Sequence, residues 1–166
     1  PQLPGERPTI DDWSDHLTTL FPEVRLKRFL EMRGADSGPW KTLCALPAFW
    51  TGLLYCETSL DAASELIRDW TAEERERLRR EVPRSGLKTA FRGGTVLDIA
   101  RRAVEISAAG LKERGHDDLI SGDERTFLEP LMEILESGQT RAEALLEAYH
   151  TRWEKSVEPI FCEHAY

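Results

Sequence analysis

A chain of 166 residues with 40% hydrophobic and 31% charged residues has the composition of about one folded globular domain, which excludes a disordered or fibrous protein. The net charge of −8 opposes attraction to nucleic acid and to anionic membranes, so we expect neither as a partner. No apolar run reaches the roughly 20 residues of a membrane span, and no segment resembles a signal peptide. We therefore expect a cytoplasmic location.

The N-terminal residues predict a linker followed by a helix. Three prolines fall within residues 1–8, which is typical of a linker. Thr9 begins a near capping box, and apolar residues then follow at helical spacing: Ile10, Trp13, Leu17 and Leu20. This pattern predicts a helix that ends near Leu20, before Pro22.

Residues 24–33 alternate between two faces, which predicts a β-strand. One face is apolar apart from Arg28 and carries Val24, Leu26, Leu30 and Met32. The opposite face carries Arg25, Lys27, Phe29, Glu31 and Arg33. A turn at residues 34–39 ends the strand. Because one strand is not stable alone, its partner must be a short strand elsewhere in the chain or an element outside it.

From Trp40 onward the pattern predicts helices joined by short loops. The expected helices cover residues 43–55, kinked or restarted at Pro47; 59–70, capped by Ser59; 71–82, begun by the Thr71 and Glu74 capping box and ended before Pro83; 96–115, ended by Gly115; 124–136, kinked or begun late at Pro130; and 140–153, begun by the Thr140 and Glu143 capping box. The predicted fold class is therefore mainly α, with about six or seven helices and one strand at residues 24–33.

The three cysteines, Cys44, Cys56 and Cys162, lack the spacing of metal ligands and cannot all pair with one another. We expect reduced, buried thiols.

Glu31 and Arg33 are the strongest candidates for chemistry. They lie two residues apart on the predicted strand, so their side chains share a face and stand about 6 to 7 Å apart along it. A carboxylate beside a guanidinium suits a site for a metal-bound nucleotide. A charged strand face is more often exposed to solvent, although Phe29 on the same face favours a covered site.

Three other clusters contain suitable residue types but favour structural roles. Residues 92–95 (RGGT) could hold an anion at a helix start, yet they lack the ending of a P-loop, and a turn with an N-cap is favoured. Residues 116–118 (HDD) and 162–164 (CEH) are short and isolated, and we interpret both as surface segments.

Several longer segments resemble the plant and proteobacterial type of glutamate–cysteine ligase. The similar segments are residues 20–36 (LFPEVRLKRFLEMRGAD), 38–40 (GPW), 43–50 (LCALPAFW), 86–92 (GLKTAFR), 111–115 (LKERG) and 156–161 (SVEPIF). The resemblance spans nearly the whole chain, but members of the family are well over twice as long. The chain therefore resembles their C-terminal portion, with residues 9–166 as part of a larger catalytic domain.

The resemblance implies an activity and two site residues. Enzymes of this family join L-glutamate to L-cysteine with ATP, the first step toward glutathione, on an antiparallel sheet related to that of glutamine synthetase. Most of that sheet would belong to the N-terminal portion, which becomes a partner of this chain. In the family's Glu-x-Arg strand motif, the carboxylate binds active-site Mg²⁺ and the arginine lies near the transferred phosphate. The matching residues are Glu31, as a metal ligand, and Arg33, as a catalytic and ATP-binding residue.

One carboxylate cannot complete a magnesium site, so we expect this chain alone to be inactive. Two alternatives stay open from the sequence. The first is a related carboxylate–amine ligase that uses another amine, and the second is a non-catalytic helical module whose strand face is merely solvated.

Overall fold

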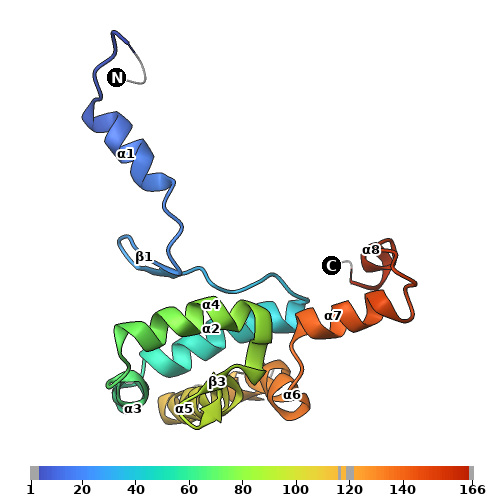
Figure 1. Ribbon diagram of the computed structural model, residues 1–166. Helices are drawn as coiled ribbons and strands as arrows, with labels where there is room; N and C mark the ends of the chain where they lie inside the picture. The colour runs from blue at the N-terminus through green and yellow to red at the C-terminus, as the bar shows by residue number, and fades with distance from the viewer. Residues whose placement is uncertain (1–3, 116, 119–121, 165–166) are drawn as a thin grey trace. The chain divides into compact units, whose positions relative to one another are not determined.

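The structure of the protein, a computed structural model, describes residues 4–115, 117–118 and 122–164. The chain forms two compact units, Pro1–Ser37 and Gly38–Tyr166. In the described residues the α-helices are α1 (Ile10–Thr18), α2 (Trp40–Leu54), α3 (Glu57–Ile67), α4 (Ala72–Ser85), α5 (Val96–Arg114), α6 (Glu129–Ser137), α7 (Arg141–His150) and α8 (Pro159–Glu163) (Figure 1). The prediction of a mainly α fold is confirmed, and none of these helices has the length and apolarity that a bilayer crossing requires.

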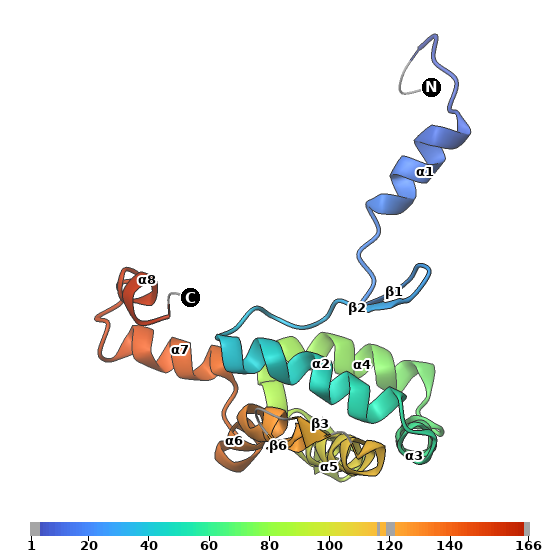
Figure 2. The ribbon, with the colours of Figure 1, turned by 180° about the vertical axis from the view of Figure 1, so that it is seen from behind.

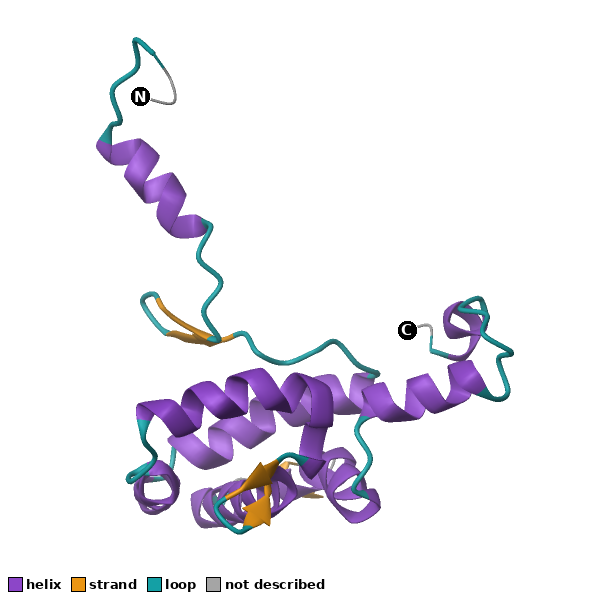
Figure 3. Ribbon diagram, in the orientation of Figure 1, coloured by secondary structure: helices purple, strands orange, loops and turns teal. Residues whose placement is uncertain are grey.

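In the described part of the chain the strands are short, and each pairs with its neighbour in sequence (Figure 3). The three antiparallel pairs are β1 (Val24–Leu26) with β2 (Leu30–Met32), β3 (Ala90–Phe91) with β4 (Gly94–Thr95), and β5 (Asp117–Asp118) with β6 (Gly122–Asp123). Two 3₁₀ helices complete the described elements, η1 (Gly86–Lys88) and η2 (Glu124–Leu128).

The first unit begins with α1, whose start matches the prediction. The Thr9 hydroxyl accepts a hydrogen bond from the Asp12 amide at 3.2 Å, and the Asp12 carboxylate accepts one from the Thr9 amide at 2.6 Å. α1 buries none of its residues, and its apolar stripe is exposed. The expected linker at residues 1–8 stays a prediction, and its first three residues lie outside the described part of the chain.

The segment predicted as one strand at residues 24–33 is a hairpin of two strands. Val24 pairs with Met32 and Leu26 with Leu30, and the Lys27 amide donates to the Phe29 carbonyl across the turn at 2.9 Å. The alternation of side chains continues through this turn, and no Gly, Pro or Asn marks it, so periodicity alone could not reveal the reversal. The partner that the strand needs therefore lies within the segment itself.

The second unit is built around α5, which packs against α2, α3, α6 and η2. Figures 1 and 2 show α5 beside α2 and α6 from both sides. The core cluster consists of Val104, Leu111, Leu128 and Leu135, and partly buried side chains from α2, α5 and α6 pack against it. These residues hold the helices together through the burial of apolar surface.

Two glycines allow α2 and α5 to approach closely. A Cβ atom added at Gly52 would collide with the Ser107 carbonyl, and one added at Gly110 would collide with the Gly52 carbonyl. Both positions are buried and lie within regular helices. The absence of a side chain at these two positions therefore sets the distance between the helix backbones.

Two buried serines add hydrogen bonds between the same helices. The Ser107 hydroxyl of α5 donates to the Phe49 carbonyl of α2 at 2.9 Å. The Ser59 hydroxyl of α3 donates to the Ile106 carbonyl at 3.1 Å. Ser59 was expected to cap α3, but this helix begins two residues earlier, at Glu57. The Ser59 hydroxyl forms the tertiary hydrogen bond to α5 instead. The interpretation of Ser59 as a cap is therefore wrong.

Two prolines lie inside helices that the sequence predicted to kink, restart or end. α2 starts at Trp40 and runs through Pro47 without interruption, and α4 continues past Pro83 to Ser85. Each proline removes only one helical hydrogen bond. Packing of α2 against α5 offsets the loss at Pro47. Pro83 lies two residues before the end of α4, so few helical hydrogen bonds follow it.

The other helix starts agree with the capping signals. The boxes at Thr71 and Thr140 both form, and Gly115 ends α5 with φ 63°. α6 begins late, with Pro130 in its first turn after η2. The short α8 was not predicted.

We expect Gly110→Ala to destabilise the protein by about 1–3 kcal/mol, because the new methyl group overpacks the contact with α2. The direction of the change in unfolding free energy is diagnostic, because Gly→Ala inside a helix ordinarily stabilises the helix by about 1 kcal/mol. Urea unfolding followed by circular dichroism measures the change.

The control is Gly34→Ala, whose Cβ would meet only the Glu23 Cβ at 3.9 Å. This variant should change the free energy of unfolding by less than about 0.5 kcal/mol. A Gly110→Ala protein as stable as the control would contradict the close approach.

Candidate functional site

The β1–β2 hairpin, visible in Figure 2, carries both candidate residues. It brings the Glu31 and Arg33 side chains together, as the sequence predicted. Glu31 lies in β2 opposite Arg25 of β1, and Arg33 follows β2 directly. The Arg33 amide donates to the Glu23 carbonyl at 2.8 Å, which extends the ladder past the strand end. Arg33 Nε lies 4.0 Å from Glu31 Oε2. The two candidate side chains therefore share one face of the hairpin.

Two further cations meet the same carboxylate oxygen. Arg25 Nε lies 3.8 Å and Lys27 Nζ 3.5 Å from Glu31 Oε2. Sequence reasoning placed Arg25 and Lys27 on the face of Glu31 but assigned them no role. The signal was the alternation itself, which put four charged side chains on one face.

Neither candidate residue has its hydrogen bonding completed. Glu31 Oε2 and Arg33 Nη1 are both shielded from solvent and have no hydrogen-bond partner in the described structure. The ion pairs around Glu31 are longer than the usual N–H···O distance of about 2.7–3.2 Å. Buried polar atoms are ordinarily paired, so Arg33 has a free donor and Glu31 a free acceptor. Arg77 Nε, Arg114 Nε and Glu124 Oε2 lack hydrogen-bond partners in the same way.

Glu31 fits one position of a magnesium site, since Mg²⁺ takes oxygen ligands and Glu31 Oε2 accepts no hydrogen bond. No cluster of three or more metal-binding side chains occurs among the residues that the structure describes. Mg²⁺ prefers six oxygen ligands, so the other ligands would come from substrate phosphates, water or other parts of the protein. The hairpin can thus contribute one carboxylate and one guanidinium to a larger site.

The candidate anion loop at residues 92–95 is a β-hairpin turn followed by a helix cap. Arg92 and Gly93 have φ values of 46° and 82°, which is typical of a type I′ turn. Thr95 and Asp98 form the capping box of α5. The favoured interpretation as a turn with an N-cap is confirmed.

The donors of Arg92 are engaged by protein groups. Its guanidinium makes two hydrogen bonds to the Glu74 carboxylate, at 2.6 and 2.7 Å, and bonds to the Asp69 carboxylate and carbonyl at 2.7 Å. It also lies over the Phe91 ring, 5.5 Å from the centroid. The paired guanidinium, followed by the Thr71 amide, lowers the pKa of Glu74 to about 2, and these carboxylates raise the pKa of Arg92. This arginine holds the turn to α4 and has little capacity left for an anion.

Of the two remaining candidate segments, residues 162–164 are exposed, as the surface interpretation predicted. Of residues 116–118, His116 lies outside the described residues, and the next two form the backbone of β5. Glu163 accepts hydrogen bonds from Arg152 at 2.6 Å and from the Trp153 indole at 3.0 Å, and this pairing with Arg152 lowers the pKa of Glu163. That carboxylate therefore joins α8 to the chain after α7.

All three cysteines are free thiols, but they differ in burial. Cys56 is buried, Cys44 is half-buried and Cys162 is exposed. The expectation of buried thiols is thus wrong for Cys162, which lies on the short α8 near the chain's C-terminal end.

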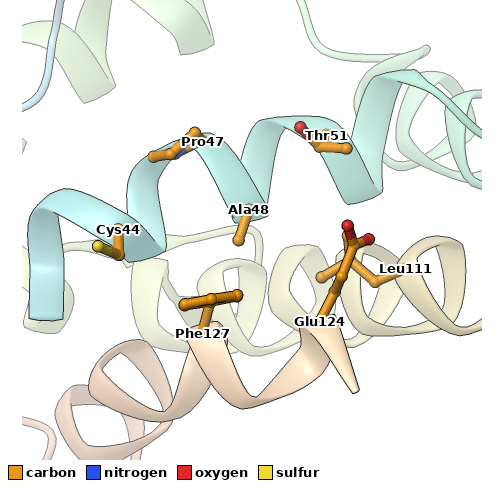
Figure 4. Close-up of a pocket in the computed structure, with 7 residues that line it drawn as sticks. All are labelled: Cys44, Pro47, Ala48, Thr51, Leu111, Glu124 and Phe127. Carbon is orange, nitrogen blue, oxygen red and sulfur yellow. The ribbon is translucent and has the colours of Figure 1, made fainter. Parts of the chain in front are cut away.

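A cavity of about 320 Å³ lies between α2, α5 and η2 (Figure 4). Figure 4 shows its lining, which is mostly apolar: Cys44, Pro47, Ala48, Thr51, Leu111, Glu124 and Phe127. The Glu124 carboxylate points toward α2 and lies 3.9 Å from Arg114 Nε. The sequence offered no signal for this cavity, because its walls come from distant segments.

The comparisons with known proteins decide the family. The model of glutamate–cysteine ligase family 2 matches residues 4–163. This chain belongs to that family. The chloroplastic glutamate–cysteine ligase A of Oryza sativa subsp. indica is 55% identical over all 166 residues, which cover 100% of this chain and 32% of the relative. The chloroplastic ligases of Solanum lycopersicum and Arabidopsis thaliana are 54% and 52% identical, and this chain covers 31% of each.

The glutamate–cysteine ligase family membership confirms the resemblance, and it corrects the expected location. The relatives named above are chloroplastic proteins, which contradicts the expectation of a cytoplasmic one. The physical reason is that charge and hydropathy describe solubility, whereas the compartment is set by separate targeting segments.

We expect the Arg92 network to make stability depend on pH. A carboxyl whose folded pKa is depressed stabilises the fold above its unfolded pKa, and this contribution is lost as the pH falls through the folded value. For Glu74 the loss should occur between pH 4.5 and about 2. Glu74→Gln should therefore flatten the fall in unfolding free energy over this range.

Urea unfolding at several pH values compares Glu74→Gln with Glu136→Gln, an exposed carboxylate on α6. The Glu136 variant should retain the wild-type pH dependence. Identical slopes for the two variants would show that the Glu74–Arg92 pair does not stabilise the fold.

Proposed function

We propose that this chain supplies Glu31 and Arg33 to the active site of an ATP-dependent ligase that joins L-glutamate to L-cysteine. The observation that carries the proposal is that Glu31 Oε2 and Arg33 Nη1 both lack hydrogen-bond partners, on side chains whose ion pair spans 4.0 Å. They lie within a chain that belongs to glutamate–cysteine ligase family 2. The chain spans 32% of the rice relative's length, so the rest of the full-length protein would complete the site.

The proposed reaction has two steps. An oxygen of the glutamate side-chain carboxylate attacks the γ-phosphorus of ATP, the bond to the bridging oxygen breaks, and ADP leaves with the electron pair. The product is γ-glutamyl phosphate. The cysteine amine then attacks its acyl carbon, inorganic phosphate leaves, and the nitrogen loses a proton to give the amide.

Charge is the main obstacle in the first step, because two anions must meet. Arg33 would donate from Nη1 to an oxygen of the transferred phosphate, as a planar guanidinium suits that geometry. Glu31 would give a carboxylate oxygen to Mg²⁺, which, when bound, neutralises the phosphoryl oxygens. The hairpin holds both side chains on one face, so they would act on the same phosphate group.

The proposal is tested on the full-length protein that contains this chain. Phosphate release from ATP should require glutamate and cysteine together. Faster release with another amine would favour a related carboxylate–amine ligase, and no release would favour a non-catalytic helical module. The isolated chain of 166 residues is expected to show neither turnover nor measurable ATP affinity at millimolar Mg²⁺, since its described residues hold no complete metal cluster.

Glu31→Gln keeps the size of the side chain and removes its charge. In the full-length enzyme we expect turnover to fall at least about a hundredfold, the usual scale for the loss of one electrostatic group in an active site. A coupled assay of ADP release at saturating Mg²⁺ measures this. Glu57→Gln makes the same chemical change on the exposed surface of α3 and should leave turnover unchanged. Near-normal turnover of Glu31→Gln would refute the metal role.

A further inference from the structure

The β1–β2 hairpin holds more positive charge than Glu31 can neutralise. The side chains of Arg25, Lys27 and Arg33 all face one carboxylate oxygen, at distances of 3.5 to 4.0 Å. This surplus lies in a chain whose net charge is −8. Neighbouring cations repel one another, by about 1 kcal/mol at 4 Å in water and by more where the site is shielded. The cluster is therefore suited to an anion with several negative charges.

Two of the three cations are held in place by other groups. Arg25 Nη2 donates to the Leu20 carbonyl at 3.3 Å, which ties the guanidinium to the segment that precedes β1. The Arg33 guanidinium lies over the Phe21 ring, 5.5 Å from the centroid. Both side chains are about three-quarters buried, with 28% and 25% of their surface exposed. Their positions are thus largely set before any ligand binds.

Lys27 is held less firmly. Its side chain is 45% exposed, and its ammonium group lies 3.5 Å from Glu31 Oε2 and 5.9 Å from the centroid of the Phe29 ring. Neither contact is a hydrogen bond. A lysine has a flexible stem and three donors that can rotate toward a new acceptor. Lys27 can therefore leave Glu31 without breaking a hydrogen bond.

We propose that Lys27 is a nucleotide-binding residue. Its side chain turns away from Glu31, and its ammonium group then contacts a phosphate oxygen of ATP. The inference rests on the proposed function, since it takes Glu31 as a metal ligand. A carboxylate that shares its oxygen with a divalent cation attracts a neighbouring ammonium group less strongly. The triphosphate offers Lys27 replacement negative charge at the same place. Arg25, which stays tied to Leu20, acts as a positioning residue for Glu31.

The test compares nucleotide binding by full-length variants. Isothermal titration calorimetry with Mg²⁺ and AMP-PNP, a non-hydrolysable ATP analogue, gives Kd without turnover. Lys27→Met removes the charge and keeps the stem, and we expect Kd to rise at least about tenfold, the effect of losing one charge-assisted contact. Lys27→Gln should show the same loss, and Lys27→Arg should retain most of the affinity. Circular dichroism shows whether each variant is folded.

Arg28→Met is the matched control, since Arg28 lies in the same hairpin turn but outside the ion pairs of Glu31. Its Kd should stay within about twofold of wild type, as for a surface substitution. Unchanged Kd for the folded Lys27 variants, with a wild type that binds and turns over, would overturn this inference alone. A rise in Kd for Arg28→Met as large as that for Lys27→Met would also overturn this inference. A wild type that neither binds Mg²⁺ and AMP-PNP nor releases phosphate would instead refute the proposed function.

Discussion

The close approach of α2 and α5 is the constraint on which the larger unit depends. Gly52 and Gly110 leave no room for a side chain between the two backbones, and Ser107 fills the neighbouring space while donating to the Phe49 carbonyl. α5 can then contact α3, α6 and η2 as well, so a single helix organises most of the unit. The Ser59 hydroxyl fastens α3 to the same helix. The apolar core and the cavity beside η2 both lie along this contact.

Arg92 and Arg33 differ in how many of their hydrogen-bond donors are engaged. The Arg92 guanidinium makes short bonds to Glu74 and Asp69, which leaves it committed to the β3–β4 turn. Arg33 faces a carboxylate at 4.0 Å and retains a shielded donor with no partner. Both involve the same residue types and both lie near hairpins. The difference lies in the unused hydrogen-bonding capacity, which a protein keeps at a cost and which a ligand can fill.

The candidate site could be predicted in part from the sequence. Alternation placed Glu31 and Arg33 on one face, and the family resemblance supplied their expected roles, which stay predictions. The position of Lys27 beside Glu31 across the hairpin turn was not predictable, because a single extended strand would have carried these side chains apart along its length. The reversal at residues 27–29 depends on the pairing of Val24 with Met32 and Leu26 with Leu30, not on a turn residue. The membership of this chain in glutamate–cysteine ligase family 2 rests on its similarity to the family and to longer relatives.

The sequence by itself determined where half of the described α-helices begin. The capping boxes at Thr9, Thr71 and Thr140 involve groups only three residues apart, so they can be recognised from the local sequence. Only the tertiary structure decided that α2 continues through Pro47 and that Ser59 bonds to α5 rather than capping α3. In these cases a contact between distant segments outweighs a local preference of about 1–3 kcal/mol. Local hydrogen bonds can be read along the chain, whereas packing depends on which segments meet.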